Sequence, residues 1–402
     1  MEVRPGYKQS EVGVIPEEWE VKTLGEIGDV RMCKRVLKQQ TRSHGDVPFY
    51  KIGTFGGVAN AYISGSLFEE FRRRYSFPKK GDVLISAAGT IGRSVVFDGA
   101  SAYFQDSNIV WIENDESKAT NEYLWHRYQV TKWAVSHGGT VARLYNDSLR
   151  TKIYVPVPPL PEQRAIAAAL SDVDALLGGL DRLIAKKRDL KQAAMQQLLT
   201  GQTRLPGFSG AWEVKRIAEI GIPSAEKNTD GATLPVLTCS KHFGFMDSLG
   251  FFKNQVFSKD LSTYRVIRRD EIGYPANHVE EGSIGLQYLY DIALVSPIYV
   301  VFRVAAEVSS FFLHRLLKLD SYRQRFKTAT TSSVDRRGSL RWRAFSEITV
   351  ELPPMKAEQT AIAAVLSDMD AELAALEARR DKTRDLKQAM MQELLTGRTR
   401  LL

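Results

Sequence analysis

The stretches DLKQAAMQQLLTGQTRL at residues 189–205 and DLKQAMMQELLTGRTRL at residues 385–401 are nearly identical and lie 196 residues apart. The same register continues upstream without an insertion, from EQRAIAAALSDVDALLGGLDRL at residue 162 to EQTAIAAVLSDMDAELAALEAR at residue 358. Self-similarity at one fixed offset is the signature of a repeat architecture. The chain therefore contains one long segment twice.

A shorter pair of similar stretches precedes these two copies. IPEEWEVKTLGEIG begins at residue 15, and FSGAWEVKRIAEIG begins at residue 208, directly after the first long copy ends. The bodies that follow, roughly residues 30–150 and 222–345, share little similarity. The order is thus A, B, A′, B′, with B duplicated faithfully and A diverged, which indicates a fixed frame that carries two different binding domains.

The long repeated segments have the apolar spacing of helices that pack along a seam. Steps of three and four residues average 3.5, the coiled-coil period. In the first copy the seam positions are Ile166, Leu170, Val173, Leu177, Leu180, Ile184, Leu190, Ala194 and Leu198, and in the second they are Ile362, Leu366, Met369, Leu373, Leu376, Met390 and Leu394. Proline pairs precede both helices, and Gly201 and Gly397 follow the LLT sequences that end them, as expected for helix boundaries.

A helix of about 35 residues is roughly 50 Å long, and alone it would expose its apolar stripe. We therefore expect the two copies to pack as an antiparallel coiled coil within one chain, with the two A domains at opposite ends. Lys187, Arg380 and Thr383 interrupt the seam, where a polar residue can fix the register or mark a docking position for a partner. The alternative is two separate helix-containing domains that arose by duplication.

The two A segments have the pattern of mixed domains that run from strands to a helix and then to a loop. GDVLISAAGTIGRSVVF at 81–97 and NIVWIE at 108–113 predict strands in the first segment, and NEYLWHRYQVTKWAVSH predicts the helix. In the second segment, EIGYPANHVEEGSIGLQYLY and IALVSPIYVVFRV predict strands, and SSFFLHRLLKLDSYRQRF predicts the helix. The alternation in WEVKTL indicates an edge strand that opens each domain. The expected fold class is α+β.

Composition is that of a globular, basic protein. The 402 residues match two modules of about 200 residues, and 44% are hydrophobic. Lys and Arg outnumber Asp and Glu by 55 to 47, a balance that permits nucleic-acid binding without proving it. The sequence contains no apolar run of 18 residues and begins without an apolar signal segment, so we expect a soluble, cytoplasmic protein without membrane association. Two distant cysteines, Cys33 and Cys239, fit a reducing compartment.

The sequence resembles the specificity subunits of type I restriction-modification enzymes over essentially its whole length. The resemblance rests on the motifs quoted above and on VPPLPEQRAIAAAL and LPPMKAEQTAIAAVL, which lead into the two helices. It implies two α/β target recognition domains joined by two long helices in a pseudo-twofold repeat. We place recognition domain 1 at 1–157, the central helical spacer at 158–207, recognition domain 2 at 208–352 and the C-terminal helical spacer at 353–402. Because the second domain has RDEIGYPANHVEEGSIG where the first has KGDVLISAAGTIG, its half-site should differ.

The resemblance further implies a non-catalytic subunit that reads an asymmetric bipartite sequence in double-stranded DNA. It would position two adenine methyltransferase subunits and the restriction and translocase subunits, and S-adenosylmethionine, ATP and Mg would be bound by those partners and not by this chain. The sequence itself lacks a phosphate-binding loop of the G-x-x-x-x-G-K-[ST] type and a methyl-donor loop, and Cys239 and His242 alone make a poor zinc site. Two alternatives remain: a coiled-coil adaptor that binds no DNA, and a recognition subunit of a methyltransferase-only or phage-defence complex.

Candidate DNA contacts follow from side-chain chemistry, because Arg and Lys bind guanine edges or phosphates and Asn and Gln can read adenine. The candidates in the first domain are Arg72, Arg74, Arg93, Gln105, Asn108, His137, Thr140 and Arg143. The candidates in the second domain are Tyr274, Asn277, His278, Gln287, Ser332, Arg336 and Arg337. Several of them lie in the loops SHGGTVARLYNDS at 136–148 and TATTSSVDRRGS at 328–339.

Overall fold

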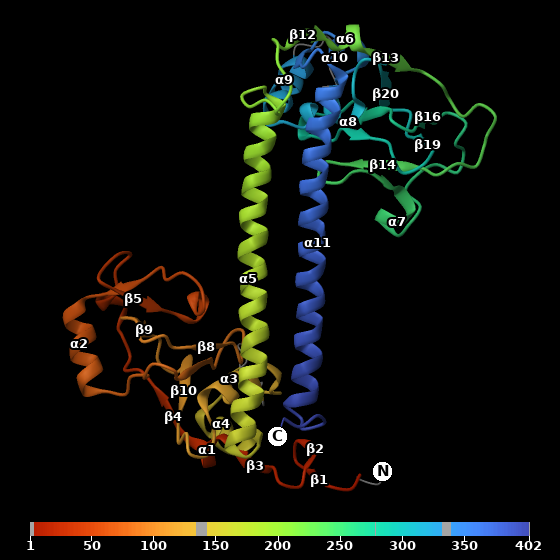
Figure 1. Cartoon of the computed structure of the whole chain (residues 1–402). Coiled ribbons are helices and arrows are strands. Elements are labelled where there is room, and N and C mark those ends of the chain that lie inside the picture. The colour runs from red at the N-terminus through yellow and green to blue at the C-terminus, as the bar shows by residue number, and fades with distance from the viewer. Residues whose placement is uncertain (1–3, 134–142, 278, 332–338, 402) are drawn as a thin grey trace. The chain divides into compact units, whose positions relative to one another are not determined.

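The computed structural model describes residues 4–133, 143–277, 279–331 and 339–401. The chain divides into two compact units: unit 1 comprises residues 1–181 and 378–402, and unit 2 comprises residues 182–377. Two long helices, α5 (Leu160–Leu199) and α11 (Lys356–Leu394), each contribute one part to unit 1 and the other part to unit 2 (Figure 1). Both helices lie within the ranges predicted for the helical spacers.

Unit 1 is built on an antiparallel sheet of four strands in the order β4-β10-β7-β8. Its strands are β1 (Tyr7–Ser10), β2 (Gly13–Pro16), β3 (Glu20–Thr23), β4 (Gly28–Met32), β5 (Val47–Tyr50), β6 (Tyr62–Ile63), β7 (Val83–Ser86), β8 (Ser94–Val96), β9 (Tyr103–Phe104), β10 (Ile109–Asn114) and β11 (Tyr154–Val157). Its short helices are α1 (Leu24–Ile27), α2 (Gly65–Arg74), α3 (Asn121–Val130) and α4 (Asn146–Lys152). A second, three-stranded sheet of order β6-β5-β9 packs with α2 around aromatic side chains.

Unit 2 has a four-stranded antiparallel sheet of the corresponding order, β13-β20-β17-β18. Its strands are β12 (Glu213–Arg216), β13 (Gly221–Ser224), β14 (Leu237–Ser240), β15 (Gly244–Asp247), β16 (Arg265–Arg268), β17 (Ile272–Pro275), β18 (Gly285–Leu286), β19 (Ile292–Val295), β20 (Tyr299–Val304) and β21 (Thr349–Leu352). Its short helices are α6 (Ile217–Ile220), α7 (Ser248–Phe252), α8 (Ser310–Leu317), α9 (Asp320–Thr331) and α10 (Trp342–Phe345). The predicted single helix after the strands is therefore two helices, α8 and α9.

The two diverged A segments thus share one framework. The WEVK sequences form the predicted opening strands, β3 paired with β11 and β12 paired with β21. A buried glutamine then ties the helix cap of each domain to the start of a long helix. Gln163 Oε1 accepts a hydrogen bond from the Thr120 N–H at 2.9 Å, and Gln359 Oε1 accepts one from the Ser309 N–H at 2.8 Å. The predicted α+β class and two-domain repeat are confirmed.

The two copies of the repeated segment contact each other, because the end of each copy binds the start of the other. In unit 1, Arg400 forms two hydrogen bonds of 2.6 and 2.9 Å with the buried carboxylate of Glu162, which also accepts a bond from Trp19 Nε1. In unit 2, Arg204 binds the buried Glu358 in the same forked way, at 2.5 and 2.6 Å. Each unit is therefore closed by a segment that comes from the distant copy of the repeat.

The glycine of each LLTG sequence is needed at the turn that follows the long helix. Gly397 adopts a φ of +70°, a left-handed conformation that favours glycine. A Cβ atom there would lie 2.5 Å from Pro16 Cδ and 3.1 Å from the ring of Trp19. The close approach lets the turn after α11 pack on the end of β2 and on Trp19. Gly201 has the same φ and packs on Trp212 in unit 2.

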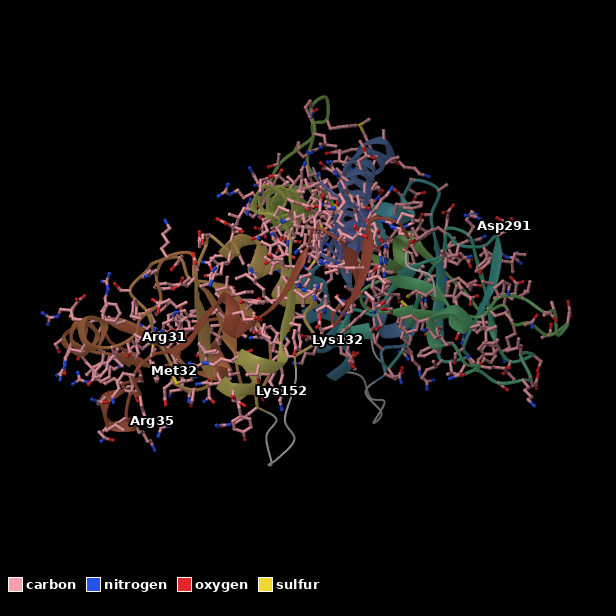
Figure 2. All side chains as sticks on the ribbon, turned by 90° about the horizontal axis from the view of Figure 1, so that it is seen from below. Arg31, Met32, Arg35, Lys132, Lys152 and Asp291 are labelled. Atoms are coloured by element: carbon pink, nitrogen blue, oxygen red, sulfur yellow. The ribbon has the colours of Figure 1, made fainter. Side chains whose placement is uncertain are left out.

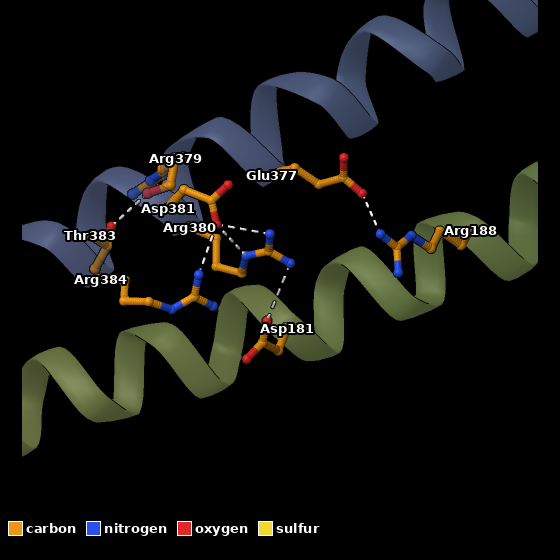
Figure 3. A network of polar contacts seen from close by, with 8 residues as sticks. All are labelled: Asp181, Arg188, Glu377, Arg379, Arg380, Asp381, Thr383 and Arg384. Atoms are coloured by element: carbon orange, nitrogen blue, oxygen red, sulfur yellow. Dashed lines mark hydrogen bonds and ion pairs between the residues drawn. The ribbon is translucent and has the colours of Figure 1, made fainter. Parts of the chain in front are cut away.

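The two long helices run antiparallel within each unit, as predicted. In unit 1, Lys387 of α11 pairs with Asp174 of α5 at 2.7 Å, and Arg380 lies 3.9 Å from Asp181. In unit 2, the ion pairs join Lys191 to Asp370, Lys187 to Glu372 and Arg188 to Glu377. Figure 3 shows the pairs made by Arg380 and Arg188. Two of these pairs correspond through the repeat, since Lys387 follows Lys191 by 196 residues and Asp370 follows Asp174 by 196.

The apolar seam differs from the prediction at Leu190. Ile166, Leu170, Leu180 and Ile184 are buried as expected, but Leu190 is 47% exposed, and its counterpart Leu386 is 56% exposed. The seam is instead continued by the stems of Lys187 and Lys191, which reach across to carboxylates of α11. Thr383 is buried in the seam, where its hydroxyl donates to the Arg379 carbonyl at 2.8 Å.

Candidate nucleic-acid interface

Unit 1 has a polar hollow of about 390 Å³ where β10 begins, called the β10 hollow below. Three candidates predicted from the sequence, Gln105, Asn108 and Arg143, meet in it. The complete lining is Arg35, Val36, Lys38, Thr41, Phe49, Lys51, Gln105, Asp106, Ser107, Asn108 and Arg143. The segment after β4, the end of β5 and the turn before β10 therefore present their polar side chains to one place.

The turn before β10 is held firmly by hydrogen bonds. Gln105 Oε1 accepts from the Ile52 N–H at 2.9 Å, and the Asn108 carbonyl accepts from the Ala87 N–H at 2.7 Å. Ser107 adopts a φ of +54°, a strained backbone conformation for a residue with a side chain. Asn108 Oδ1 is buried and has no hydrogen-bond partner among the described residues. The described residues thus provide no partner for Asn108 Oδ1, as is seen at functional positions.

Cationic side chains dominate the β10 hollow. Arg35, Lys38, Lys51 and Arg143 line it against the single carboxylate of Asp106. Arg35 pairs with Asp106 at 2.9 Å, and Figure 2 shows Arg35 at the margin of unit 1. A concave surface with surplus positive charge attracts phosphates, while the neighbouring amides can donate to and accept from base edges. The chemistry is that expected for contact with a nucleic acid.

Unit 2 has a hollow of about 720 Å³ at the corresponding place, called the β20 hollow below. The correspondence follows from backbone hydrogen bonds. In unit 1, Ala87 donates to the Asn108 carbonyl and accepts from the Leu144 N–H at 2.9 Å. In unit 2, Ala276 donates to the Ile298 carbonyl at 3.2 Å and accepts from the Leu340 N–H at 2.7 Å. Asn108 and Ile298 therefore occupy equivalent positions at the starts of β10 and β20.

The two hollows differ in the side chains that they present. Where the β10 hollow has Asn108 and Arg143, the equivalent residues of the β20 hollow are Ile298 and Ser339. The β20 hollow gains polar character from other positions, namely Ser224, Arg265, Asn277 and Arg341, and it includes the aromatic rings of Tyr299 and Trp342. One framework thus carries two chemically different surfaces.

Comparisons with known proteins agree on one family. Residues 16–185 match the family model described as the type I restriction modification DNA specificity domain. A putative type I restriction enzyme specificity subunit of Haemophilus influenzae is 54% identical over 174 residues, which cover 43% of this chain and 45% of that protein. This chain is thus similar to the type I restriction enzyme specificity subunits. It spans about half the length of the Haemophilus relative in that match.

Two further comparisons extend over the whole chain. The type I restriction enzyme MjaVIII specificity subunit of Methanocaldococcus jannaschii is 22% identical over 415 residues, covering 96% of this chain and 94% of the relative. The crystal structure of the type I restriction-modification system S subunit from M. genitalium superposes with a TM-score of 0.57 at 15% identity, covering 98% of both chains. At that identity the superposition shows a shared fold.

The other candidates in recognition domain 1 lie outside the β10 hollow. Arg93 is exposed, but its guanidinium donates to the Phe55 carbonyl at 2.8 Å and so braces the turn at Phe55. Arg72 and Arg74 are exposed on α2, where Arg72 lies over Phe68 and Phe77 and Arg74 pairs with Glu70 at 3.1 Å. They remain predictions. His137 and Thr140 lie outside the described residues.

Two candidates in recognition domain 2 are wrong. Tyr274 is fully buried on β17 and packs on Phe345, with ring centroids 4.5 Å apart. Gln287 is fully buried as well, and its amide bonds to the backbone of Leu289 and Tyr290, so it holds a turn. Neither side chain reaches the surface of unit 2. Asn277 lines the β20 hollow as a candidate should. His278, Ser332, Arg336 and Arg337 lie outside the described residues.

Sequence reasoning missed the cations that give the β10 hollow its charge. Arg35, Lys38 and Lys51 were not selected, although the run CKRVLKQQ at 33–40 directly follows β4 and concentrates basic residues. That run was the available signal. In the β20 hollow, Arg265 was missed because it is carried on a strand, β16, with no motif around it.

Three further features concern the cysteines, metal binding and membrane-spanning helices of the described residues. Burial raises the pKa of both thiols, Cys33 and Cys239, to about 12, so both are protonated at neutral pH and unsuited to nucleophilic work. Within the described ranges, no three His, Cys, Asp or Glu side chains gather where they could hold a metal ion. None of the described helices is both long and apolar enough to cross a membrane.

Proposed function

We propose that this chain reads an asymmetric, bipartite DNA sequence for a type I restriction-modification complex. The observation that supports this most directly is the β10 hollow, where four cations and two amide side chains meet. Arg and Lys side chains bind the sugar-phosphate backbone and set the position of the protein on DNA, while Asn, Gln and Arg discriminate base edges. The hollow combines both requirements on one concave surface.

The proposal of two different half-sites rests on the pair of hollows. Each lies at the start of the equivalent central strand, yet Asn108 and Arg143 in one are Ile298 and Ser339 in the other. Side chains with different donors and acceptors select different bases. The two recognition domains are therefore expected to read two unlike sequences, with unread base pairs between them.

We further propose that the helices hold two adenine methyltransferase subunits, one on each copy of the repeat. The ion pairs of Lys387 with Asp174 and of Lys191 with Asp370 recur at equivalent positions, so identical partners would meet equivalent surfaces. Catalysis would belong to those partners and to restriction and translocase subunits, which would bring S-adenosylmethionine, ATP and Mg. The alternative form of this proposal is a complex in which the chain binds methyltransferase subunits and no restriction subunit.

The test is base-resolution mapping of methylated adenines in a methylation-free host that produces the chain with its cognate methyltransferase. We expect marks that depend on this chain and form one asymmetric two-part motif. The double variant Lys38→Gln, Lys51→Gln removes two exposed cations from the β10 hollow and should erase the marks, while Lys118→Gln, an exposed lysine elsewhere in unit 1, should leave them. An intact complex without chain-dependent marks would instead favour an adaptor that binds no DNA.

A further inference from the structure

Unit 1 contains a second basic hollow, of about 460 Å³, that the proposed reading surfaces do not include. It is enclosed by the hairpin β1–β2, the end of α3, the segment from α4 to β11 and the end of α11. The charged side chains in its lining are Glu11, Arg127, Lys132, Lys152 and Arg398. Figure 2 shows Lys132 and Lys152 close together, and we call this site the Arg127 hollow.

The guanidinium of Arg127 is the unusual group in this hollow. Its Nε atom is buried and has no hydrogen-bond partner among the described residues. Burial lowers the pKa of Arg127, and the nearby Tyr123 offsets only part of that effect. Neither Lys132 nor Lys152 pairs with a carboxylate in the described part of the chain, and Arg398 is the one cation of the hollow with such a partner, Glu393 at 3.5 Å. A half-buried cation left without a counter-charge is costly, and a bound anion would remove that cost.

The equivalent place in unit 2 is built differently. The caps Thr120 and Ser309 correspond through their glutamine partners, so Arg127 corresponds to Leu316, which is buried in the apolar core. The hollow beside α8 in unit 2 is lined by three cations and three carboxylates, which balance: Arg188, Lys191, Lys318, Asp320, Asp370 and Glu377. The surplus of positive charge is therefore particular to unit 1.

We propose that the Arg127 hollow binds a backbone phosphate of DNA next to the half-site that unit 1 reads, an inference that rests on the proposed function. Two identical methyltransferase subunits would need equivalent surfaces on both repeats, and this site has no equivalent. In the sequence, Lys132 and Lys152 flank the loop 136–148 that was predicted to contact DNA. An arginine fork supported by two lysines suits a phosphate, whose oxygens accept several charge-assisted hydrogen bonds. Such a contact positions the domain and carries no base preference.

The test measures the salt dependence of DNA binding by the complex of this chain with its cognate methyltransferase. The double variant Lys132→Gln, Lys152→Gln changes two exposed side chains, so it should fold like the wild type. The slope of log affinity against log salt should fall by about 1, because one phosphate contact no longer releases counterions. Affinity at low salt should fall equally for target and non-target duplexes, and the methylated motif should stay the same. Arg127→Gln should act in the same direction, and Lys118→Gln is the matched control.

Three results would overturn the proposal. The first is a slope for the Lys132→Gln, Lys152→Gln complex equal to that of the Lys118→Gln complex, while the wild type binds DNA in a salt-sensitive way. This result would rule out the phosphate contact and leave the proposed function intact. Loss of methyltransferase from the complex, with an unchanged slope for what remains, would assign the hollow to an acidic protein surface. A wild-type complex that binds its methyltransferase but shows no salt-sensitive DNA binding would refute the proposed function and this inference together.

Discussion

At the scale of single residues, the arginine at the end of each repeated segment, Arg204 or Arg400, binds a buried carboxylate. Glu162 and Glu358 are almost fully buried, and each depends on a forked contact with the arginine from the other copy. Glu162 has a further donor in Trp19 Nε1, whereas the corresponding Trp212 Nε1 is buried without a partner in the described residues. The two sites therefore differ in what remains when the arginine is removed.

We predict that Arg204→Gln destabilises unit 2 by about 3 kcal/mol or more, since a buried carboxylate would lose its counter-charge. Arg400→Gln should cost unit 1 less, because Trp19 still donates to Glu162. Equilibrium unfolding in denaturant measures both. Part of the stability should return in two double variants, one that combines Arg204→Gln with Glu358→Gln and one that combines Arg400→Gln with Glu162→Gln. Losses below about 0.5 kcal/mol in the single variants would instead show that these pairs behave as ordinary surface ion pairs.

His126 predicts a pH response in unit 1. The side chain is fully buried, with Nδ1 4.0 Å from Asp174 and Nε2 3.1 Å from the Ser171 hydroxyl. Burial lowers the pKa of His126 from 6.5 to about 4, although Asp174 acts in the opposite direction. At pH values between 6.5 and 4 the unfolded chain binds a proton that the folded chain does not, so stability decreases as pH falls through this window.

Going from pH 7.5 to pH 5, this one group should lower the free energy of unfolding of unit 1 by about 2 kcal/mol. His126→Gln should lose correspondingly less over the same interval in denaturant unfolding, which isolates this group from the carboxylates that also titrate. His314→Gln serves as the matched variant in unit 2, where burial likewise lowers the pKa of His314 to about 4. Equal pH dependence of wild type and His126→Gln would show that His126 binds its proton at the same pH in the folded and the unfolded protein.

At the scale of elements, the exposed leucines of α5 and α11 call for a partner. Leu190 and Leu386 occupy equivalent positions of the repeated segment, and both side chains are exposed. Next to Leu190, the seam is continued by the stems of Lys187 and Lys191. Exposed apolar side chains at two equivalent places suit two copies of one partner. We predict that Leu190→Ser and Leu386→Ser each weaken binding of one methyltransferase copy and leave the other in place.

The measurement is the mass of the purified complex, for example by native mass spectrometry, under dilution. Each single variant should populate a species with one methyltransferase per chain, and the double variant a species with none. Leu176→Ser, at another exposed leucine of α5 that has no leucine counterpart in the repeat, is the control. Full occupancy in the double variant would move the docking surface away from these leucines.

The elements also show what the sequence could and could not predict. Periodicity and helix punctuation located both long helices, because thirty or more residues of regular spacing outweigh local exceptions. Tyr274 and Gln287 were misread because β17 and the segment after it are covered on both faces: Gly273 approaches Phe245 while Tyr274 packs on Phe345. A strand buried on both faces lacks the alternation that separates core from surface. Arg35, Lys38 and Lys51 of the β10 hollow were missed because they lie far in the sequence from the predicted Gln105, Asn108 and Arg143, and only the fold brings the two sets together.

At the scale of the whole molecule, duplication separates two tasks. Each copy of the repeat ends in an arginine that binds the buried glutamate at the start of the other copy, so both units are closed by the same forked contact. The domain bodies keep one sheet order and diverge at the strand ends that form the hollows. A frame with this division can exchange the chemistry of one hollow without disturbing the other, since neither hollow shares a lining residue with the other unit.

Independent hollows lead to our last prediction, that a change in one unit alters one half of the recognised sequence. Asn108→Ala in the β10 hollow should relax or change base preference at one or two positions of a single half-site, with a loss of about 1–3 kcal/mol in discrimination at each position. Asn277→Ala in the β20 hollow should do the same in the other half-site and leave the first untouched. Mapping methylated motifs for both variants and for the double variant checks this directly. Because the hollows are separate, the double variant should show the two changes added together; altered preference in both halves from either single substitution would mean that the units read DNA as one coupled surface.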